Sequence, residues 1–192
     1  MKIGVLALQG DFAEHIVILK RLGVEAIEVR LPEQLDGLAG VIIPGGESTT
    51  MGKLADEYKL IGPLRQFAQS KAIWGTCAGA IFLSKDAHRQ QPLLQLMDIA
   101  VERNAFGRQV ASFEADLQVK ALQLVDAVDR PYHAIFIRAP MIEKVYGKAQ
   151  VLAALDNGKI VAAQEGRLMA TSFHLELIDD DCFHQYFLSL AG

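Results

Sequence analysis

The chain has 192 residues, of which 51% are hydrophobic, and it carries a formal net charge of −4 at neutral pH. This length suits one domain with a sizeable core, and we treat residues 1–192 as that domain. The acidic balance, without a cluster of lysine and arginine, argues against nucleic acid or a membrane surface as a partner. Two cysteines and no signal-like start predict a reducing, cytoplasmic setting.

The first part of the chain alternates short apolar runs with amphipathic stretches. Residues 3–8 predict a buried strand, and residues 12–22 have apolar residues at helical spacing that stops at Gly23. Such alternation is typical of a mostly parallel sheet with helices on both faces. Further strands are predicted at residues 26–29, 41–43 and 72–74, and further helices at residues 49–58 and 61–70.

A glycine pair follows the predicted strand at residues 41–43. Gly45 and Gly46 let backbone N–H groups turn toward a neighbouring site without obstruction by side chains. The same turn also suits the start of a helix, with Ser48 or Thr49 as its N-cap. The two interpretations are compatible, because the cap and the N–H donors use different atoms.

Residues 75–79 place a cysteine between small residues where a strand passes into a helix. Gly75 and Gly79 permit the sharp turn that lifts a nucleophile above a sheet. Cys77 would then lie at a helix N-terminus, where free N–H groups and the helix dipole favour the thiolate. The N–H of Ala78 and one N–H of the glycine pair would form an oxyanion hole. A buried cysteine in a glycine-rich turn is the alternative interpretation.

The middle of the chain, residues 98–140, has short strands and more polar residues, which predicts an antiparallel excursion at a sheet edge. The predicted fold class is therefore α/β: a single-domain, three-layer, flavodoxin-like fold with a mostly parallel central sheet, helices on both faces and an antiparallel edge. Later strands are predicted at residues 151–155, 160–164 and 167–170, a hairpin turn at residues 156–158 and a last helix at residues 180–190.

A histidine and a glutamate follow the last predicted strand. In extended backbone, side chains two apart share a face, so His174 and Glu176 are predicted to project together. A cysteine nucleophile needs a base, and the base needs a group that fixes its tautomer, so these residues and Cys77 predict a Cys-His-Glu triad. One of the acids at residues 179–181 is an alternative orienting group, although they suit the start of a helix better. No catalytic role is assigned to His15, His88, His133 or His184, and Cys182 is expected to be a buried, small apolar residue.

These features together resemble class I glutamine amidotransferases and, among them, the glutaminase subunits of pyridoxal 5′-phosphate synthases. The resemblance covers essentially the whole chain. One departure is Leu175, since the family usually has proline between the histidine and the glutamate, and leucine gives up the stiffness of proline. Besides the cysteine turn and the His-x-Glu pair, the resemblance rests on the segments at residues 8–10, 44–51, 102–109, 112–115 and 136–140.

The resemblance implies that the chain hydrolyses L-glutamine to L-glutamate and ammonia through a γ-glutamyl thioester at Cys77. It implies no metal and no cofactor. The implied partner is a (β/α)₈-barrel synthase, assembled in a ring-shaped hetero-oligomer, that receives the ammonia. Docking on that partner is expected to complete the oxyanion hole, so the isolated chain should have low activity. The implied glutamine-binding residues are Gly46, Glu47, Ser48, Arg103, Ile137 and Arg138.

Three other functions compete with this interpretation. Another class I glutaminase, such as one that feeds imidazole glycerol phosphate formation, is disfavoured by residues 102–109 and 136–140. A cysteine peptidase or stress protein with a similar sheet generally takes its histidine from beside the cysteine. A regulatory module with a degenerate site draws slight support from Leu175.

Overall fold

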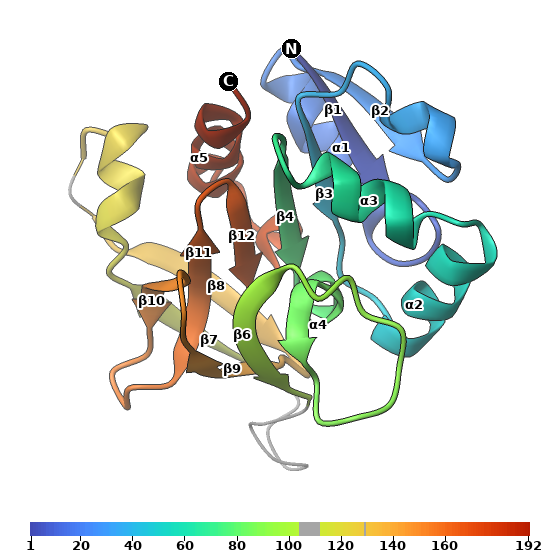
Figure 1. Cartoon of the computed structure of the whole chain (residues 1–192). Helices are drawn as coiled ribbons and strands as arrows, with labels where there is room; N and C mark the ends of the chain where they lie inside the picture. The colour runs from blue at the N-terminus through green and yellow to red at the C-terminus, as the bar shows by residue number, and fades with distance from the viewer. Residues whose placement is uncertain (104–111, 129) are drawn as a thin grey trace.

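The computed structural model describes residues 1–103, 112–128 and 130–192 (Figure 1). Residues 104–109, part of one segment that carries the resemblance, lie outside the described residues. The strands are Lys2–Leu6 (β1), Glu25–Val29 (β2), Gly40–Ile43 (β3), Ala72–Thr76 (β4), Ser84–Asp86 (β5), Met97–Glu102 (β6), Ser112–Leu117 (β7), Tyr132–Ile137 (β8), Met141–Val145 (β9), Gln150–Ala154 (β10), Ile160–Glu165 (β11) and Leu168–Thr171 (β12). The α-helices are Phe12–Arg21 (α1), Ser48–Glu57 (α2), Ile61–Phe67 (α3), Ala78–Leu83 (α4) and Cys182–Ala191 (α5), with 3₁₀ turns at Pro32–Leu35 (η1), Lys120–Leu124 (η2) and Leu175–Leu177 (η3).

The main sheet has the strand order β2-β1-β3-β4-β12-β11-β9-β6-β5, and β10 also pairs with β11. Neighbours from β2 to β12 are parallel, whereas β12, β11, β9 and β6 pair antiparallel. Every residue of β3 and β4 is buried, because helices cover both faces, and this is why these strands are continuous apolar runs. The predicted α/β fold class is confirmed.

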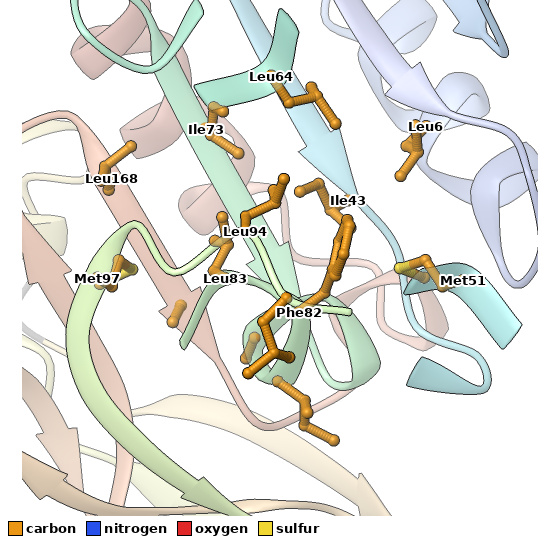
Figure 2. Packing of buried hydrophobic residues seen from close by; sticks show 14 of the residues in the cluster. Leu6, Ile43, Met51, Leu64, Ile73, Phe82, Leu83, Leu94, Met97 and Leu168 are labelled. Atoms are coloured by element: carbon orange, nitrogen blue, oxygen red, sulfur yellow. The ribbon is translucent and has the colours of Figure 1, made fainter. Parts of the chain in front are cut away.

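Alternate residues of β4 enter two separate cores. Ile73 belongs to the core under α2, α3 and α4, where it lies near Leu64 (Figure 2). Trp74 points to the opposite face and packs against Phe183 and Phe187 of α5, in the core that α1 also covers. The period-two alternation of a strand thus produces the three layers of the fold.

The ends of two helices illustrate how local chemistry sets the boundaries. α1 ends before Gly23, whose φ of +75° suits glycine after a helix. α2 begins differently from the prediction, which named Ser48 or Thr49 as N-cap. Glu47 is the N-cap, and its carboxylate accepts hydrogen bonds from the N–H groups of Thr49 at 3.2 Å and Thr50 at 2.7 Å. The prediction of the cap was therefore wrong, because the longer glutamate side chain folds back over the first turn.

The excursion predicted in the middle of the chain contains a separate antiparallel pair. β7 and β8 form their own two-stranded sheet, in which Phe113 and Phe136 stack with ring centroids 4.4 Å apart. Phe136 and Tyr132 of β8 are buried in the core that α5 covers. This packing brings the end of β8 toward the carboxyl ends of the main strands.

The late elements follow the prediction closely. β10 and β11 form an antiparallel hairpin around residues 156–158, as expected for an Asp-Asn-Gly turn. The last helix begins at Cys182, two residues later than predicted. Within the described part of the chain, none of the helices has both the length and the apolarity that a membrane crossing requires.

Candidate active site

The carboxyl ends of three neighbouring parallel strands, β3, β4 and β12, meet at one edge of the sheet. Ligands of open α/β sheets bind at such an edge. The glycine pair follows β3, Cys77 follows β4, and His174 comes three residues after β12. Because Thr171 pairs in register with Thr76, the ends of β12 and β4 are level. Segments far apart in the sequence therefore converge here.

Cys77 occupies a strained turn between β4 and α4. Its φ of +48° and ψ of −105° are a conformation that residues with side chains rarely adopt. The flanking glycines are required by space: a Cβ on Gly75 would lie 2.4 Å from the carbonyl oxygen of Gly79, and one on Gly79 would lie 2.1 Å from that of Ile43. The N–H of Cys77 donates to the carbonyl of Thr171 at 2.8 Å, which fixes the turn to β12.

His174 connects the sulfur to a carboxylate. Its ring lies near Cys77, since a Cβ on Gly45 would be 3.4 Å from Cε1 of His174 and 3.6 Å from Cβ of Cys77. Its Nδ1 lies 2.5 Å from Oε1 of Glu176. Burial of the ring opposes protonation, but the interactions with Cys77 and Glu176 outweigh it and raise the pKa of His174 to about 10. Burial likewise opposes ionisation of Glu176, yet the hydrogen bond with His174 lowers the pKa of that carboxyl. The arrangement stabilises an imidazolium beside the ionised Glu176 carboxylate.

The link between His174 and Glu176 is a 3₁₀ turn. His174 has extended backbone, and its N–H donates to the carbonyl of Ile135 in β8 at 2.8 Å. The predicted pairing of His174 with Glu176 occurs, but the predicted reason for it was wrong. Glu176 lies in η3, so the two side chains do not meet through the alternation of a strand. Leu175 has no exposed surface and is part of the core with Phe173. Packing of the leucine thus holds the link that a proline would stiffen.

The acids after this turn are engaged elsewhere. Asp179 and Asp181 pair with Arg21 of α1, and Oδ2 of Asp180 lies 2.7 Å from the guanidinium of Arg130. These contacts leave Glu176 as the carboxylate that hydrogen-bonds His174, so the alternative orienting groups are not supported.

Cys77 and His174 line a cavity of about 460 Å³ at this edge of the sheet. This volume lies within the usual range for small-molecule sites, roughly 300–1,000 Å³. Of the predicted residues, Gly45 and Glu176 are not part of the lining, although Gly45 lies close to His174 and Cys77, and Glu176 hydrogen-bonds His174. The cavity is lined by Gln9, Asp11, Gly46, Glu47, Ser48, Cys77, Ala78, Ile81, Arg103, Ile137, Arg138, Pro140 and His174.

Glu47 and Arg103 form an ion pair in the cavity wall. Nη1 of Arg103 lies 2.9 Å from Oε1 of Glu47 and donates to the hydroxyl of Thr49 at 3.2 Å. Burial opposes ionisation of Glu47, but hydrogen bonds from Thr50 and Thr49 and the charge of Arg103 lower its pKa to about 2. This wall of the cavity therefore carries an ionised carboxylate whose charge is paired with that of Arg103.

Arg138 contributes the other guanidinium. It is exposed at the end of β8 and has a φ of +44°, and Ile137 beside it is half-buried. Within the described residues, no ion pair engages Arg138. A positive charge is thus available to a ligand at this wall.

Hydrogen bonds connect the segment of the glycine pair to the loop after β1. The carbonyl of Gly45 accepts the N–H of Asp11 at 3.2 Å, and the N–H of Glu47 donates to the side-chain oxygen of Gln9 at 2.7 Å. Across the cavity, Ala78 is the first residue of α4, where an N–H has no acceptor within the helix. Gly46 and Ala78 both line the cavity, and the oxyanion hole expected from the N–H of Ala78 and one N–H of the glycine pair stays a prediction.

A family model for the SNO glutamine amidotransferase family matches residues 5–191 of this chain. The chain belongs to this family. The shared fold thus extends over nearly all of the sequence, including the cysteine turn and the His-x-Glu segment.

Curated relatives of this family are similar over their whole length. A protein of Herpetosiphon aurantiacus, named pyridoxal 5′-phosphate synthase subunit PdxT, is 53% identical over 99% of this chain and 100% of its own. A protein of Thermus thermophilus with the same name is 50% identical over 99% of this chain and 97% of its own.

Solved structures agree with this assignment. A crystal structure described as a glutamine amidotransferase superposes with a TM-score of 0.92 at 50% identity, over 99% of this chain and 98% of the other. A putative GMP synthase component of Thermoplasma acidophilum has a TM-score of 0.69 at 18% identity, over 100% of this chain and 94% of the other. The second comparison shows the fold alone.

Sequence reasoning missed some residues of this SNO family member. Asp11 and Ile81 line the cavity without having been predicted, and Gln9 was noted only as part of the resemblance. His15 and His184, to which no catalytic role was assigned, are fully buried: His15 lies beside Glu176, and His184 contacts His15. Their position depends on the packing of α1 against α5, which no local pattern reveals.

Proposed function

We propose that the chain is the glutaminase subunit of a pyridoxal 5′-phosphate synthase and hydrolyses L-glutamine to L-glutamate and ammonia. The observation that carries this proposal is the hydrogen-bonded pair of His174 and Glu176 beside Cys77, at the wall of a cavity large enough for an amino acid. Membership of a glutamine amidotransferase family and relatives named as synthase subunits support the substrate and the pathway.

The reaction runs through a covalent intermediate. The Cys77 thiolate attacks the side-chain amide carbon of glutamine, and His174 gives a proton to the departing ammonia as the C–N bond breaks. Water then attacks the γ-glutamyl thioester, with its proton passing to His174, and glutamate leaves as the sulfur is released. Glu176 stabilises the imidazolium and holds its tautomer, as the carboxylate of a triad does.

Backbone donors stabilise the oxyanion formed in both steps. The N–H of Ala78 supplies one donor, and an N–H of Gly45 or Gly46 supplies the other. Loss of one such donor typically raises a barrier by roughly 2.7–4 kcal/mol. We expect partner docking to complete this oxyanion hole, so the isolated chain should turn over slowly.

Charged side chains of the cavity suit the α-carboxylate and the α-ammonium group of glutamine. The Arg138 guanidinium can bind the α-carboxylate through two parallel hydrogen bonds. The Glu47 carboxylate, held by Arg103, suits the α-ammonium group, and Gly46, Ser48 and Ile137 complete the cradle. Binding residues thus come from the segment after β3 and from the ends of β6 and β8.

The ammonia needs an acceptor that this chain does not supply. Free ammonia is mostly protonated in neutral water and is then not a nucleophile, so a second active site must lie against this one. We propose that this partner is a barrel-type synthase in a ring-shaped hetero-oligomer. Both cysteines are free thiols, which suits the reducing cytoplasm.

Glutamate release in the presence of the barrel partner tests the proposal. Cys77→Ala should abolish release, because no other group can form the thioester. Cys182→Ala is the matched control, since burial raises the pKa of that thiol to about 12, and it should retain native release. Unchanged release by Cys77→Ala would eliminate covalent catalysis at this sulfur.

A further inference from the structure

Two buried histidines lie directly behind the carboxylate of the site. His15 of α1 and His184 of α5 have no exposed surface, and Nδ1 of His15 lies 3.0 Å from Nε2 of His184. Both rings meet the edge of Trp74 in the core between α1, α5 and β4. Buried polar groups in such a core are costly unless they are hydrogen-bonded, so the pair calls for a physical reason.

The reason lies in the second oxygen of Glu176. The side chain of Glu176 is only 2% exposed, and Oε1 is occupied by His174. Among the described residues, Oε2 has no hydrogen-bond partner. The ring of His15 faces it, with Nε2 at 3.9 Å from Oε2 and 3.4 Å from the hydroxyl of Thr76. A small movement of the carboxylate would convert this approach into a hydrogen bond.

Only one arrangement of protons fits these contacts well. If His15 carries its proton on Nε2, it presents an N–H to the carboxylate, and its Nδ1 accepts the N–H of His184. The remaining Nδ1 of His184, which has no partner in the described part of the chain, is then merely an acceptor. The reverse arrangement leaves a buried N–H of His184 unpaired and directs a lone pair of His15 at an anion. Both features are unfavourable.

We propose that His15 is a positioning residue of the catalytic site, whose N–H holds the Glu176 carboxylate in place and ionised, with His184 fixing the tautomer of His15. The inference rests on the triad of the proposed function. It adds a neutral donor chain, from α5 through α1 to the carboxylate, that supports the charge on Glu176 without adding a charge of its own.

The electrostatics of the core agree with neutral rings. Burial is the main cause that lowers the pKa of both His15 and His184 to about 3. For His15, the neighbouring His184 also lowers the pKa while the charge of Glu176 opposes the shift, and for His184 the charge of Arg21 lowers it further. Loss of the His15 donor would leave the Glu176 carboxylate less stabilised. The carboxylate would then stabilise the imidazolium of His174 less strongly. The other titratable or charged groups that face this cluster are Asp11, Arg21, Cys77, Tyr132 and His174.

Nitrogen NMR on histidine-labelled native protein tests the proton arrangement without any substitution. Long-range proton–nitrogen couplings should show His15 with its proton on Nε2 and none on Nδ1. A proton on Nδ1 of His15 would overturn the inference, whether or not any variant folds.

Two substitutions then test the donor itself. His15→Leu removes it, whereas the side-chain amide of His15→Gln can reach the position of Nε2 and restore it. The pH at which His174 loses its proton should fall by about one unit in His15→Leu and should return toward the native value in His15→Gln. With the barrel partner present, kcat should fall about tenfold in His15→Leu, and KM should be nearly unchanged. A tenfold loss is the lower end of what removing a residue that supports an active-site ligand costs in other proteins.

The matched control is His133→Leu on the exposed face of β8, which should leave both readouts native. A folded His15→Leu protein with a native His174 titration would overturn the inference and leave the triad intact. His15→Gln behaving like His15→Leu would also overturn the donor role. The proposed function fails separately if His174→Ala releases glutamate at the native rate.

Discussion

At the scale of single residues, the site depends on one imidazole held between a sulfur and a carboxylate. His174 stays protonated to a much higher pH than an ordinary histidine, because Cys77 and Glu176 raise its pKa to about 10 against the opposing effect of burial. The proposed acid, His174, is therefore charged throughout the physiological range. Glu176 contributes to this charge together with Cys77, because its carboxylate is buried, ionised and in contact with Nδ1.

Glu176→Gln should remove the part of this support that the carboxylate supplies. We expect kcat to fall by about 10²–10⁴, toward the loss seen when the carboxylate of a related triad becomes an amide, and the pKa of His174 to move toward its ordinary value. Steady-state glutamate release across pH with the barrel partner measures both effects. Asp179→Asn, the same change at an exposed acid, should be neutral, and a native rate in Glu176→Gln would contradict the assignment.

At the scale of elements, the turn η3 shows how packing replaces a stiff backbone. Leu175 is fully buried, whereas Leu177 on the same turn is 51% exposed. The buried leucine anchors the segment that carries both His174 and Glu176. Removing its side chain therefore loosens the base and the carboxylate together.

Leu175→Ala should cost about 2–5 kcal/mol of unfolding free energy, as buried leucine truncations do, and should lower kcat as well. Leu177→Ala removes the same atoms from an exposed position and should change stability by less than about 1 kcal/mol. Urea unfolding of both variants makes the comparison. Equal losses in the two proteins would show that the turn is not held by the core.

Elements were predictable from the sequence where one local pattern decides them. The runs at Val41–Ile43 and around Trp74 were found as strands because a doubly covered strand is apolar throughout. The glycines at Gly75 and Gly79 revealed the cysteine turn because only a missing Cβ fits there. The Glu47 cap was missed, since glutamate is not a usual N-cap and acts here through its length.

The supporting histidines were not predictable for a different reason. His15 stands among apolar residues of α1 and resembles an ordinary polar member of an amphipathic helix. Its partner His184 is 169 positions away. The approach of His15 to Glu176 and its contact with His184 exist only once α1 and α5 pack on the same face of the sheet. Contacts of that kind are a property of the tertiary structure.

At the scale of the whole molecule, the histidines give the fold opposite dependences on pH. His15 and His184 have folded-state pKa values lowered to about 3, so their contribution is complete above pH 6.5 and is lost as the pH falls from about 6.5 toward 3. His174 has a raised pKa, so its contribution is complete below pH 6.5 and is lost as the pH rises toward 10. From these three groups, the fold should be most stable near pH 6.5.

His184→Phe should make the fold less sensitive to acid. Each buried histidine steepens the fall in unfolding free energy by up to about 1.4 kcal/mol per pH unit, because the unfolded chain binds a proton that the native state excludes. Urea unfolding between about pH 6.5 and pH 4.5 should therefore give a shallower slope in the variant, even if its stability at the upper pH is lower. An unchanged slope would mean that His184 is protonated in the native protein.

The order in which the segments of the site are synthesised determines when Cys77 gains the side chains that surround it in the fold. The turn that bears Cys77 leaves the ribosome long before the segment that carries His174 and Glu176, and α5 emerges after both. A nascent chain therefore exposes the Cys77 thiol before His174, Glu176 and the helix that packs behind them have been made. Under the proposed function, glutamine hydrolysis could begin at the earliest once these segments have folded against β4.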